Sequence, residues 1–211
     1  MKLEDVCSLA PVIPVLSLED AGSAPALARA LVAGGLGALE VTLRTPAALP
    51  AIEAMAKAVP EAVVGAGTLL TPRDVRSAKD AGARFGVSPG ATDRLCEAAE
   101  DAGLPLLPGV ATPSEAMRAA ERGLEVLKFF PAEPSGGVAT LRSWAGPLPR
   151  LRFCPTGGIT PETAPAYLAL TNVICLGASW VAPPAAVAAG DWARIESLAR
   201  QAAALTGRGL S

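Results

Sequence analysis

The segment LEVTLRTPAALPAIEAMAKAVPEAVVGAGTL, residues 39–69, predicts a strand, a helix and a second strand in direct succession. Residues 39–44 and 63–69 are short runs of apolar and β-branched side chains, which are typical of buried strands. Between them, the alanine- and leucine-rich residues 47–59 have the apolar periodicity of a helix. This order indicates a parallel sheet, because parallel neighbours need a long crossover connection between them.

The same alternation continues along the rest of the chain. Further strand-like runs begin at residues 12, 85, 105, 126, 152 and 173. Further helical segments follow at residues 73–82, 92–103 and 114–123. Helix starts are indicated by Thr71-Pro72 and Thr160-Pro161, and helix ends by Gly82, Gly103 and Gly123.

Eight strand–helix units without a linker predict one α/β domain over residues 1–211. The expected architecture is a (β/α)8 TIM barrel near the minimum size of that fold. A doubly wound open sheet is the alternative, because it accounts for the alternation equally well, although it usually needs fewer strands.

The charge balance excludes several classes of protein. The chain has 18 Lys and Arg against 20 Asp and Glu, a formal net charge of -2, and no histidine. Without a basic excess, nucleic acids and anionic membranes are not expected as partners. Without histidine, Ser-His-Asp and Cys-His catalysis and the commonest catalytic zinc sites are excluded, so we expect no metal and no cofactor.

The cysteines and the uncharged segments bear on location. Cys7, Cys96, Cys154 and Cys175 have no CxxC spacing and indicate buried thiols in a reducing compartment. The start MKLEDVC is acidic where a signal peptide is basic, and prolines interrupt the uncharged residues 163–190. We therefore expect a cytoplasmic protein that neither is exported nor spans a membrane.

Polar and apolar side chains alternate in the strand-like run at residues 39–44. Glu40, Thr42 and Arg44 share one face, and the apolar residues between them share the other, because successive side chains point to opposite sides of a strand. The apolar face has to meet the helices, so the polar face points into the barrel. Interior polar groups are costly unless they are paired or functional. Glu40 is therefore a candidate catalytic residue, the alternative being a structural network in which it neutralises a buried cation.

Lys128 is the only charged residue in the run VLKFFP at residues 126–131. If Leu127 and Phe129 pack outward against helices, Lys128 points inward. Burial disfavours an ammonium and makes a neutral amine available as a nucleophile. The structural alternatives are an ion pair with Glu40 or a lysine that extends to solvent. Because the chain has no histidine to act as a base, Lys128 taken with Glu40 indicates amine catalysis.

Two glycines follow the seventh strand-like run, in CPTGGI at residues 154–159. In barrels of this type, the loops after the seventh and eighth strands commonly bind phosphate through backbone amides. Gly157 and Gly158 permit close approach of the backbone, and Ser179 after the eighth run can donate a hydroxyl. These residues are candidates for a phosphate site, the alternative being ordinary turn glycines.

Seven motifs, in order and over nearly the whole chain, resemble the bacterial family of 2-keto-3-deoxy-6-phosphogluconate (KDPG) and 4-hydroxy-2-oxoglutarate (KHG) aldolases. They are LEVTLRT, VGAGTLLTP, SPG, LPGVATPSE, KFFPAE, RFCPTGGI and GASWV. The resemblance implies a class I, Schiff-base-forming lyase on a (β/α)8 barrel. It implies cleavage of KDPG to pyruvate and glyceraldehyde 3-phosphate, and also of KHG to pyruvate and glyoxylate. It further implies a homotrimer.

The resemblance also assigns roles to individual residues. Lys128 in KFFP forms the Schiff base, Glu40 in LEVTLRT acts as acid and base, and Arg44 binds the substrate carboxylate. The remaining residues contact the pyruvyl group (Thr68 and Thr156), line the pocket (Pro89 and Phe130) or form the phosphate site (Gly157, Gly158 and Ser179).

Other functions on the same scaffold stay open at this point. A 2-keto-3-deoxy-6-phosphogalactonate aldolase differs in the stereochemistry at C4, which sequence patterning does not decide. A phosphosugar-binding barrel without catalysis keeps the glycines but does not need Lys128 buried opposite Glu40. A metal-dependent epimerase or aldolase needs histidine-rich ligand sets, which this chain cannot form.

Overall fold

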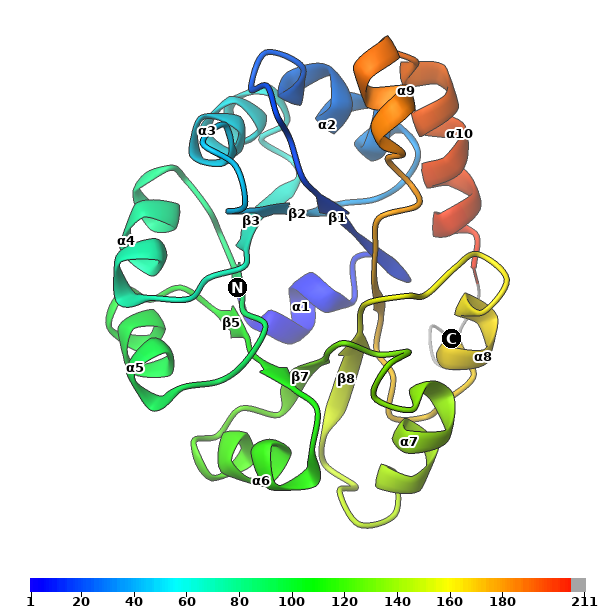
Figure 1. The fold of residues 1–211 in the computed structure, drawn as a ribbon. Coiled ribbons are helices and arrows are strands. Elements are labelled where there is room, and N and C mark those ends of the chain that lie inside the picture. The colour runs from blue at the N-terminus through cyan, green and yellow to red at the C-terminus, as the bar shows by residue number, and fades with distance from the viewer. Residues whose placement is uncertain (206–211) are drawn as a thin grey trace.

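The computed structural model describes residues 1–205 and shows parallel strands that curl around a common centre, with most of the helices on the outside (Figure 1). The strands are β1 (Val12–Leu16), β2 (Ala38–Thr42), β3 (Val63–Gly67), β4 (Gly86–Val87), β5 (Leu106–Leu107), β6 (Gly109–Val110), β7 (Val126–Phe129), β8 (Arg152–Pro155) and β9 (Leu176–Ala178). The helices are α1 (Leu3–Cys7), α2 (Ala24–Ala33), α3 (Ala48–Ala58), α4 (Pro72–Asp80), α5 (Asp93–Asp101), α6 (Pro113–Glu121), α7 (Gly137–Trp144), α8 (Ala164–Leu168), α9 (Pro184–Ala189) and α10 (Trp192–Ala203).

Hydrogen bonds join the strands into two parallel sheets. One holds six strands in the order β5-β4-β3-β2-β1-β9, and the other holds three in the order β6-β7-β8. Pro108, which has no backbone N–H to donate, lies between β5 and β6 and divides the predicted fifth strand. Isolated bridges at Phe153–Val173 and Thr156–Gly177 connect β8 to the segment that contains β9. The predicted α/β class with parallel strands is confirmed, whereas a closed eight-stranded barrel stays a prediction.

The predicted helix ends agree with the backbone conformation. The Thr71 side chain caps α4 by accepting a hydrogen bond from the N–H of Asp74, whose carboxylate reaches back to the N–H of Thr71. Gly82, Gly103 and Gly123 follow α4, α5 and α6 with φ angles of 94°, 57° and 80°. Because this left-handed conformation strains most side chains, glycine ends these helices as expected.

The segment between residues 160 and 190 differs from its prediction. α8 begins at Ala164, a few residues after the helix start predicted at Thr160-Pro161. Thr160 and Thr163 instead form a turn, in which the N–H of Thr160 donates to Thr163 Oγ1 at 3.0 Å. A second helix, α9, follows β9 within the uncharged segment that prolines interrupt. Within residues 1–205, no helix has both the length and the apolar character needed to cross a membrane.

Two apolar clusters lie on opposite sides of the strands. The outer cluster packs strands against helices and includes Leu127 and Phe129 of β7, as predicted. The inner cluster gathers side chains from the amino ends of the strands together with Val6 and Cys7 of α1. Figure 1 shows α1 in the middle of the curled strands. This helix, which the sequence analysis did not predict, fills the end at which the strands begin and leaves their carboxyl ends for a site.

The cysteines are free and buried, as predicted. Cys7, Cys154 and Cys175 lie in the inner cluster. Hydrogen bonds with Cys154 and Cys7, together with burial, raise the pKa of the Cys175 thiol well above its usual range. Cys175 therefore stays a neutral thiol and packs as a small apolar side chain.

Gly65 of β3 leaves room inside the curled strands. A Cβ at this position would lie 2.5 Å from Cζ of Phe85 and would overlap the rest of its ring. Phe85 is one of the largest fully buried side chains. Its ring therefore occupies the space that a side chain at residue 65 would need.

We expect Gly65→Ala to lower the free energy of unfolding by about 1–3 kcal/mol, because overpacking forces the Phe85 ring or β3 to shift. Gly146→Ala is the matched control, since a Cβ on Gly146 would meet no atom within 4 Å. Urea unfolding of both variants measures the difference. Equal stability of the two would contradict the tight packing of Phe85 against β3.

Candidate active site

Glu40 and Lys128 meet inside the curled strands. Glu40 is the third residue of β2 and Lys128 the third of β7, and they are only 2% and 5% exposed. Lys128 Nζ lies 3.6 Å from Glu40 Oε1. Two residues earlier in the same strands, Ala38 and Val126 belong to the inner apolar cluster. The alternation of side chains along a strand therefore predicted both directions correctly.

Glu40 and Lys128 form an ion pair whose charged atoms are too far apart for a good hydrogen bond. A separation of 3.6 Å exceeds that of a good N–H···O hydrogen bond. Oε1 of Glu40 is buried and has no hydrogen-bond partner among the described residues. Lys128 Nζ also lies 5.0 Å from the centre of the Phe130 ring, whose face attracts a cation. The two groups are therefore paired by charge, without a direct hydrogen bond between them.

Space for the Glu40 carboxylate comes from the neighbouring strand. A Cβ on Gly67 of β3 would overlap Oε1 of Glu40 and lie 2.8 Å from its Cδ. In the register of the two strands, Glu40 is opposite Gly65 and Thr42 is opposite Gly67. The sequence analysis missed Gly67. The available signal was a second glycine two residues after Gly65, on the same face of the strand.

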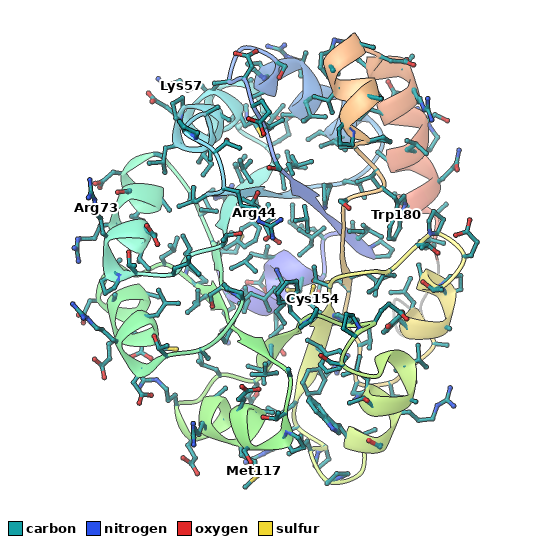
Figure 2. All side chains as sticks on the ribbon, viewed as in Figure 1. Arg44, Lys57, Arg73, Met117, Cys154 and Trp180 are labelled. Carbon is teal, nitrogen blue, oxygen red and sulfur yellow. The ribbon has the colours of Figure 1, made fainter. Side chains whose placement is uncertain are left out.

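Arg44 lies beyond the end of β2 and is exposed. Its Nε donates a hydrogen bond to Thr68 Oγ1 at 3.3 Å. Thr68 has a φ angle of 61°, a left-handed conformation that β-branched residues rarely adopt. Strain of this kind collects at functional sites, and here it accompanies the contact with Arg44. Figure 2 shows Arg44 toward the middle of the curled strands, whereas Lys57 and Arg73 lie on the outer helices.

Thr42 has a structural role that the sequence analysis did not specify. It is buried, and its hydroxyl donates to the carbonyl of Leu16 at 3.0 Å. The bond ties the end of β2 to the end of β1 at a position two residues from both Glu40 and Arg44 in the chain. It therefore helps to fix the strand end from which both site residues project.

Pro89 is half-buried in the loop after β4. In the same loop, Ser88 Oγ donates to the carbonyl of Gly90 at 2.7 Å. The loop lies against Gly109 of β6, because a Cβ on Gly109 would overlap the Pro89 carbonyl. Gly109 is in turn paired with Lys128. The structure thus places Pro89 one strand away from Lys128.

Thr156, Gly157 and Gly158 follow β8. Thr156 is buried, and Gly177 of β9 packs against its side chain. Gly157 and Gly158 have φ angles of 105° and 81°, so both positions require glycine. A Cβ on Gly157 would lie 3.4 Å from the Phe130 ring, which places this turn beside the ring that contacts Lys128.

A cavity of about 880 Å³ lies at this end of the strands. Among the predicted site residues, it is lined by Arg44, Phe130, Thr156, Gly157, Gly158 and Ser179. The other four, Lys128, Glu40, Thr68 and Pro89, do not line it. Lys128 adjoins it through the Phe130 ring. The volume suits a small organic ligand.

The sequence analysis missed other walls of this cavity. They include Ser17 of the loop after β1, Trp180, and apolar residues at and within α9 such as Pro184 and Val187. Trp180 lies in the motif GASWV but was given no role, and Ser17, Pro184 and Val187 belong to none of the seven motifs. Their place at the cavity depends on the folded chain. Figure 2 shows Trp180 beside the segment that leads out of β9.

The groups that meet here define a limited chemistry. Within residues 1–205, no three histidine, cysteine, aspartate or glutamate side chains are grouped so that they could hold a metal ion. An amine, a carboxylate, a guanidinium, hydroxyls and glycine amides are present instead. Such a set can bind an anionic carbonyl compound, add to its carbonyl carbon and transfer protons.

Comparisons with known proteins point to the same chemistry. The family model for KDPG and KHG aldolase matches residues 3–198. The KHG/KDPG aldolase of Escherichia coli (strain K12) is 50% identical over 199 residues, which are 94% of this chain and 93% of that protein.

Solved structures match nearly all of the chain. The crystal structure of 2-keto-3-deoxy-6-phospho-gluconate aldolase from Zymomonas mobilis ATCC 29191 has a TM-score of 0.94 and 48% identity, and the match covers 100% of both chains. KDPG aldolase from Legionella pneumophila, with pyruvate captured at low pH as a covalent carbinolamine intermediate, has a TM-score of 0.94 and 41% identity, covering 97% of this chain and 99% of that one. With matches of this length and identity, the chain belongs to the KDPG and KHG aldolase family.

Proposed function

We propose that the protein is a class I aldolase that cleaves KDPG to pyruvate and glyceraldehyde 3-phosphate through a Schiff base on Lys128. The observation that carries this proposal is the buried pair of Lys128 and Glu40, 3.6 Å apart, in a member of an aldolase family. The covalent carbinolamine of the Legionella relative supports a covalent route. The same chemistry extends to KHG, which would give pyruvate and glyoxylate.

Formation of the Schiff base needs a proton transfer that Lys128 and Glu40 can carry out between themselves. Transfer from the Lys128 ammonium to the unpartnered Oε1 of Glu40 gives a neutral amine and a neutral acid. The amine adds to C2 of the keto acid, and its own N–H proton moves to the carbonyl oxygen to give a carbinolamine. Glu40 then protonates the departing hydroxyl, and loss of water leaves an iminium on Lys128.

The cleavage step returns the proton to Glu40. Its carboxylate accepts the C4 hydroxyl proton while the C3–C4 bond breaks, and the electrons of that bond enter the iminium. The products of this step are an enamine on Lys128 and the free aldehyde. Glu40 then protonates the enamine at C3, and water hydrolyses the resulting iminium to pyruvate. Because the iminium accepts the electrons, the sequence of steps needs no Lewis acid.

The remaining site residues orient the substrate in this proposal. The planar fork of Arg44 matches a carboxylate, and its bond to Thr68 limits the directions that the guanidinium can take. Pro89, Phe130 and Thr156 surround the pyruvyl end. The positive-φ glycines Gly157 and Gly158, with the hydroxyl of Ser179, receive the phosphate in the cavity.

The scaffold of this proposal is one (β/α)8 barrel. Two observations support it: the Pro108 carbonyl between β5 and β6 accepts a hydrogen bond from the N–H of Lys128 at 2.9 Å, and isolated bridges connect β8 to the β9 segment. In this arrangement the two sheets enclose one interior, which contains the pair. The single domain, the homotrimer and the cytoplasmic location stay predictions.

Borohydride in the presence of pyruvate should reduce the Schiff base to a stable pyruvyl adduct on Lys128. Mass spectrometry of peptides locates the adduct. Lys128→Ala should lose both the adduct and KDPG cleavage, and its circular dichroism should match that of the wild type. An adduct on Lys2, Lys57 or Lys79 instead would refute the assignment of the nucleophile.

Gly67→Ala should reduce kcat by about 100-fold or more, because the added methyl displaces the Glu40 carboxylate that transfers protons. Gly37→Ala is the matched control: a Cβ there makes ordinary contacts of 3.7 Å and 3.8 Å with Leu9. Steady-state kinetics on KDPG compare the two. If Gly67→Ala keeps the wild-type kcat, the position of Glu40 is not critical and its role is wrong.

Ser179→Ala should reduce kcat/KM for KDPG by roughly 10- to 100-fold, because it removes a hydroxyl donor to a charged phosphate. KHG, whose shorter chain carries a carboxylate, is the control substrate and should be cleaved as before. Parallel assays on both substrates test the prediction. Equal losses on both would place the phosphate elsewhere.

A further inference from the structure

A buried phenol lies next to the turns that follow β7 and β8. Tyr167 of α8 has no exposed surface, and its hydroxyl donates to Glu133 Oε1 at 2.5 Å. This distance is typical of a hydroxyl bonded to a carboxylate. Burial and the bond to Glu133 raise the pKa of the Tyr167 phenol, so it remains a hydrogen-bond donor. Glu133 follows Lys128 closely, in the sequence KFFPAE.

Glu133 in turn holds the glycine turn after β8. Its backbone N–H donates to the Gly157 carbonyl at 3.1 Å, and the N–H of Ala132 donates to the Thr156 carbonyl at 2.8 Å. The side chain of Glu133 packs on Gly158, because a Cβ there would lie 2.8 Å from Glu133 Cβ and Cγ. Backbone and side chain of Glu133 therefore contact both glycines.

The turn that carries Glu133 wraps closely around the phenol. Gly136 and Gly137 have φ angles of 94° and 58°, and the N–H of Gly137 donates to the Ala132 carbonyl at 2.9 Å. A Cβ on Gly137 would lie 3.0 Å from the Tyr167 hydroxyl. Glycine at position 137 therefore leaves the space that the Tyr167 hydroxyl occupies.

We propose that Tyr167 is a positioning residue that acts through Glu133 to fix the Gly157–Gly158 turn for the phosphate end of the substrate. The inference rests on the proposed function, in which these glycines bind the phosphate. Neither Tyr167 nor Glu133 lines the cavity, so both act from behind the turn. Two adjacent glycines have more backbone freedom than any other pair of residues. Their amides stabilise an anion only when they are held in place beforehand.

Tyr167→Phe removes the hydroxyl and keeps the ring. We expect KM for KDPG to rise about 3- to 10-fold, the loss of one hydrogen bond, while kcat/KM for KHG stays within about 2-fold. Glu133→Gln keeps the stem on Gly158 and an acceptor for the phenol, so it should retain most of the wild-type KM. Glu133→Ala removes both and should match or exceed the effect of Tyr167→Phe.

Hydrogen–deuterium exchange tests the same idea without activity. In Tyr167→Phe, peptides that contain residues 132–137 and 156–159 should exchange faster than in the wild type, whereas peptides from α3 should not change. The inference is overturned by an unchanged KM for KDPG, by equal losses on both substrates, or by faster exchange throughout the molecule. A protein that cleaves neither substrate and forms no adduct on Lys128 fails the proposed function instead, and the exchange experiment still decides whether Tyr167 fixes the turn.

Discussion

An amine and a carboxylate 3.6 Å apart, both buried, are the constraint on which the other features depend. A single buried charge costs several kcal/mol, so the opposite charges of Lys128 and Glu40 make each other's burial less costly. Several features serve to hold them there. The inner apolar cluster packs below the pair, Gly67 leaves space for the carboxylate, and the Phe130 ring flanks the amine. The cavity lined by Arg44, Phe130 and the Gly157–Gly158 turn adjoins the pair on the side of the strand ends.

The parts of this arrangement that follow from local rules could be predicted from the sequence. Alternation along residues 39–44 and 126–131 predicted that Glu40 and Lys128 point inward. The opposite orientation would turn the apolar residues of both strands away from the helices. Glycines predicted where three of the helices end, because few residues other than glycine adopt the left-handed conformation found there. Seven ordered motifs were enough to identify the family.

The parts that depend on contacts between distant segments could not be predicted. α1 is only five residues long, too short to show a helical period. The requirement for Gly67 exists only because the Glu40 carboxylate of the next strand occupies that space. The bond between Tyr167 and Glu133 joins residues 34 positions apart. Glu133 ends the motif KFFPAE, but nothing in the sequence indicates Tyr167 as its partner. The exact start of α8 at Ala164 depends on side-chain contacts too, because the side chains of Thr160 and Thr163 each accept a hydrogen bond from the other's backbone N–H in the turn before it.

The position of α1 affects the order in which substrates bind and products leave. Together with the inner cluster, α1 fills the interior at the amino ends of the strands. Substrate and products therefore reach and leave Lys128 through the cavity at the carboxyl ends. In the proposed reaction, the pyruvyl fragment is tethered at the bottom of this dead-end passage and the aldehyde lies nearer the mouth. The aldehyde therefore leaves first and pyruvate last. In the condensation direction, pyruvate has to bind before the aldehyde. An aldehyde that binds first blocks the path of pyruvate to Lys128.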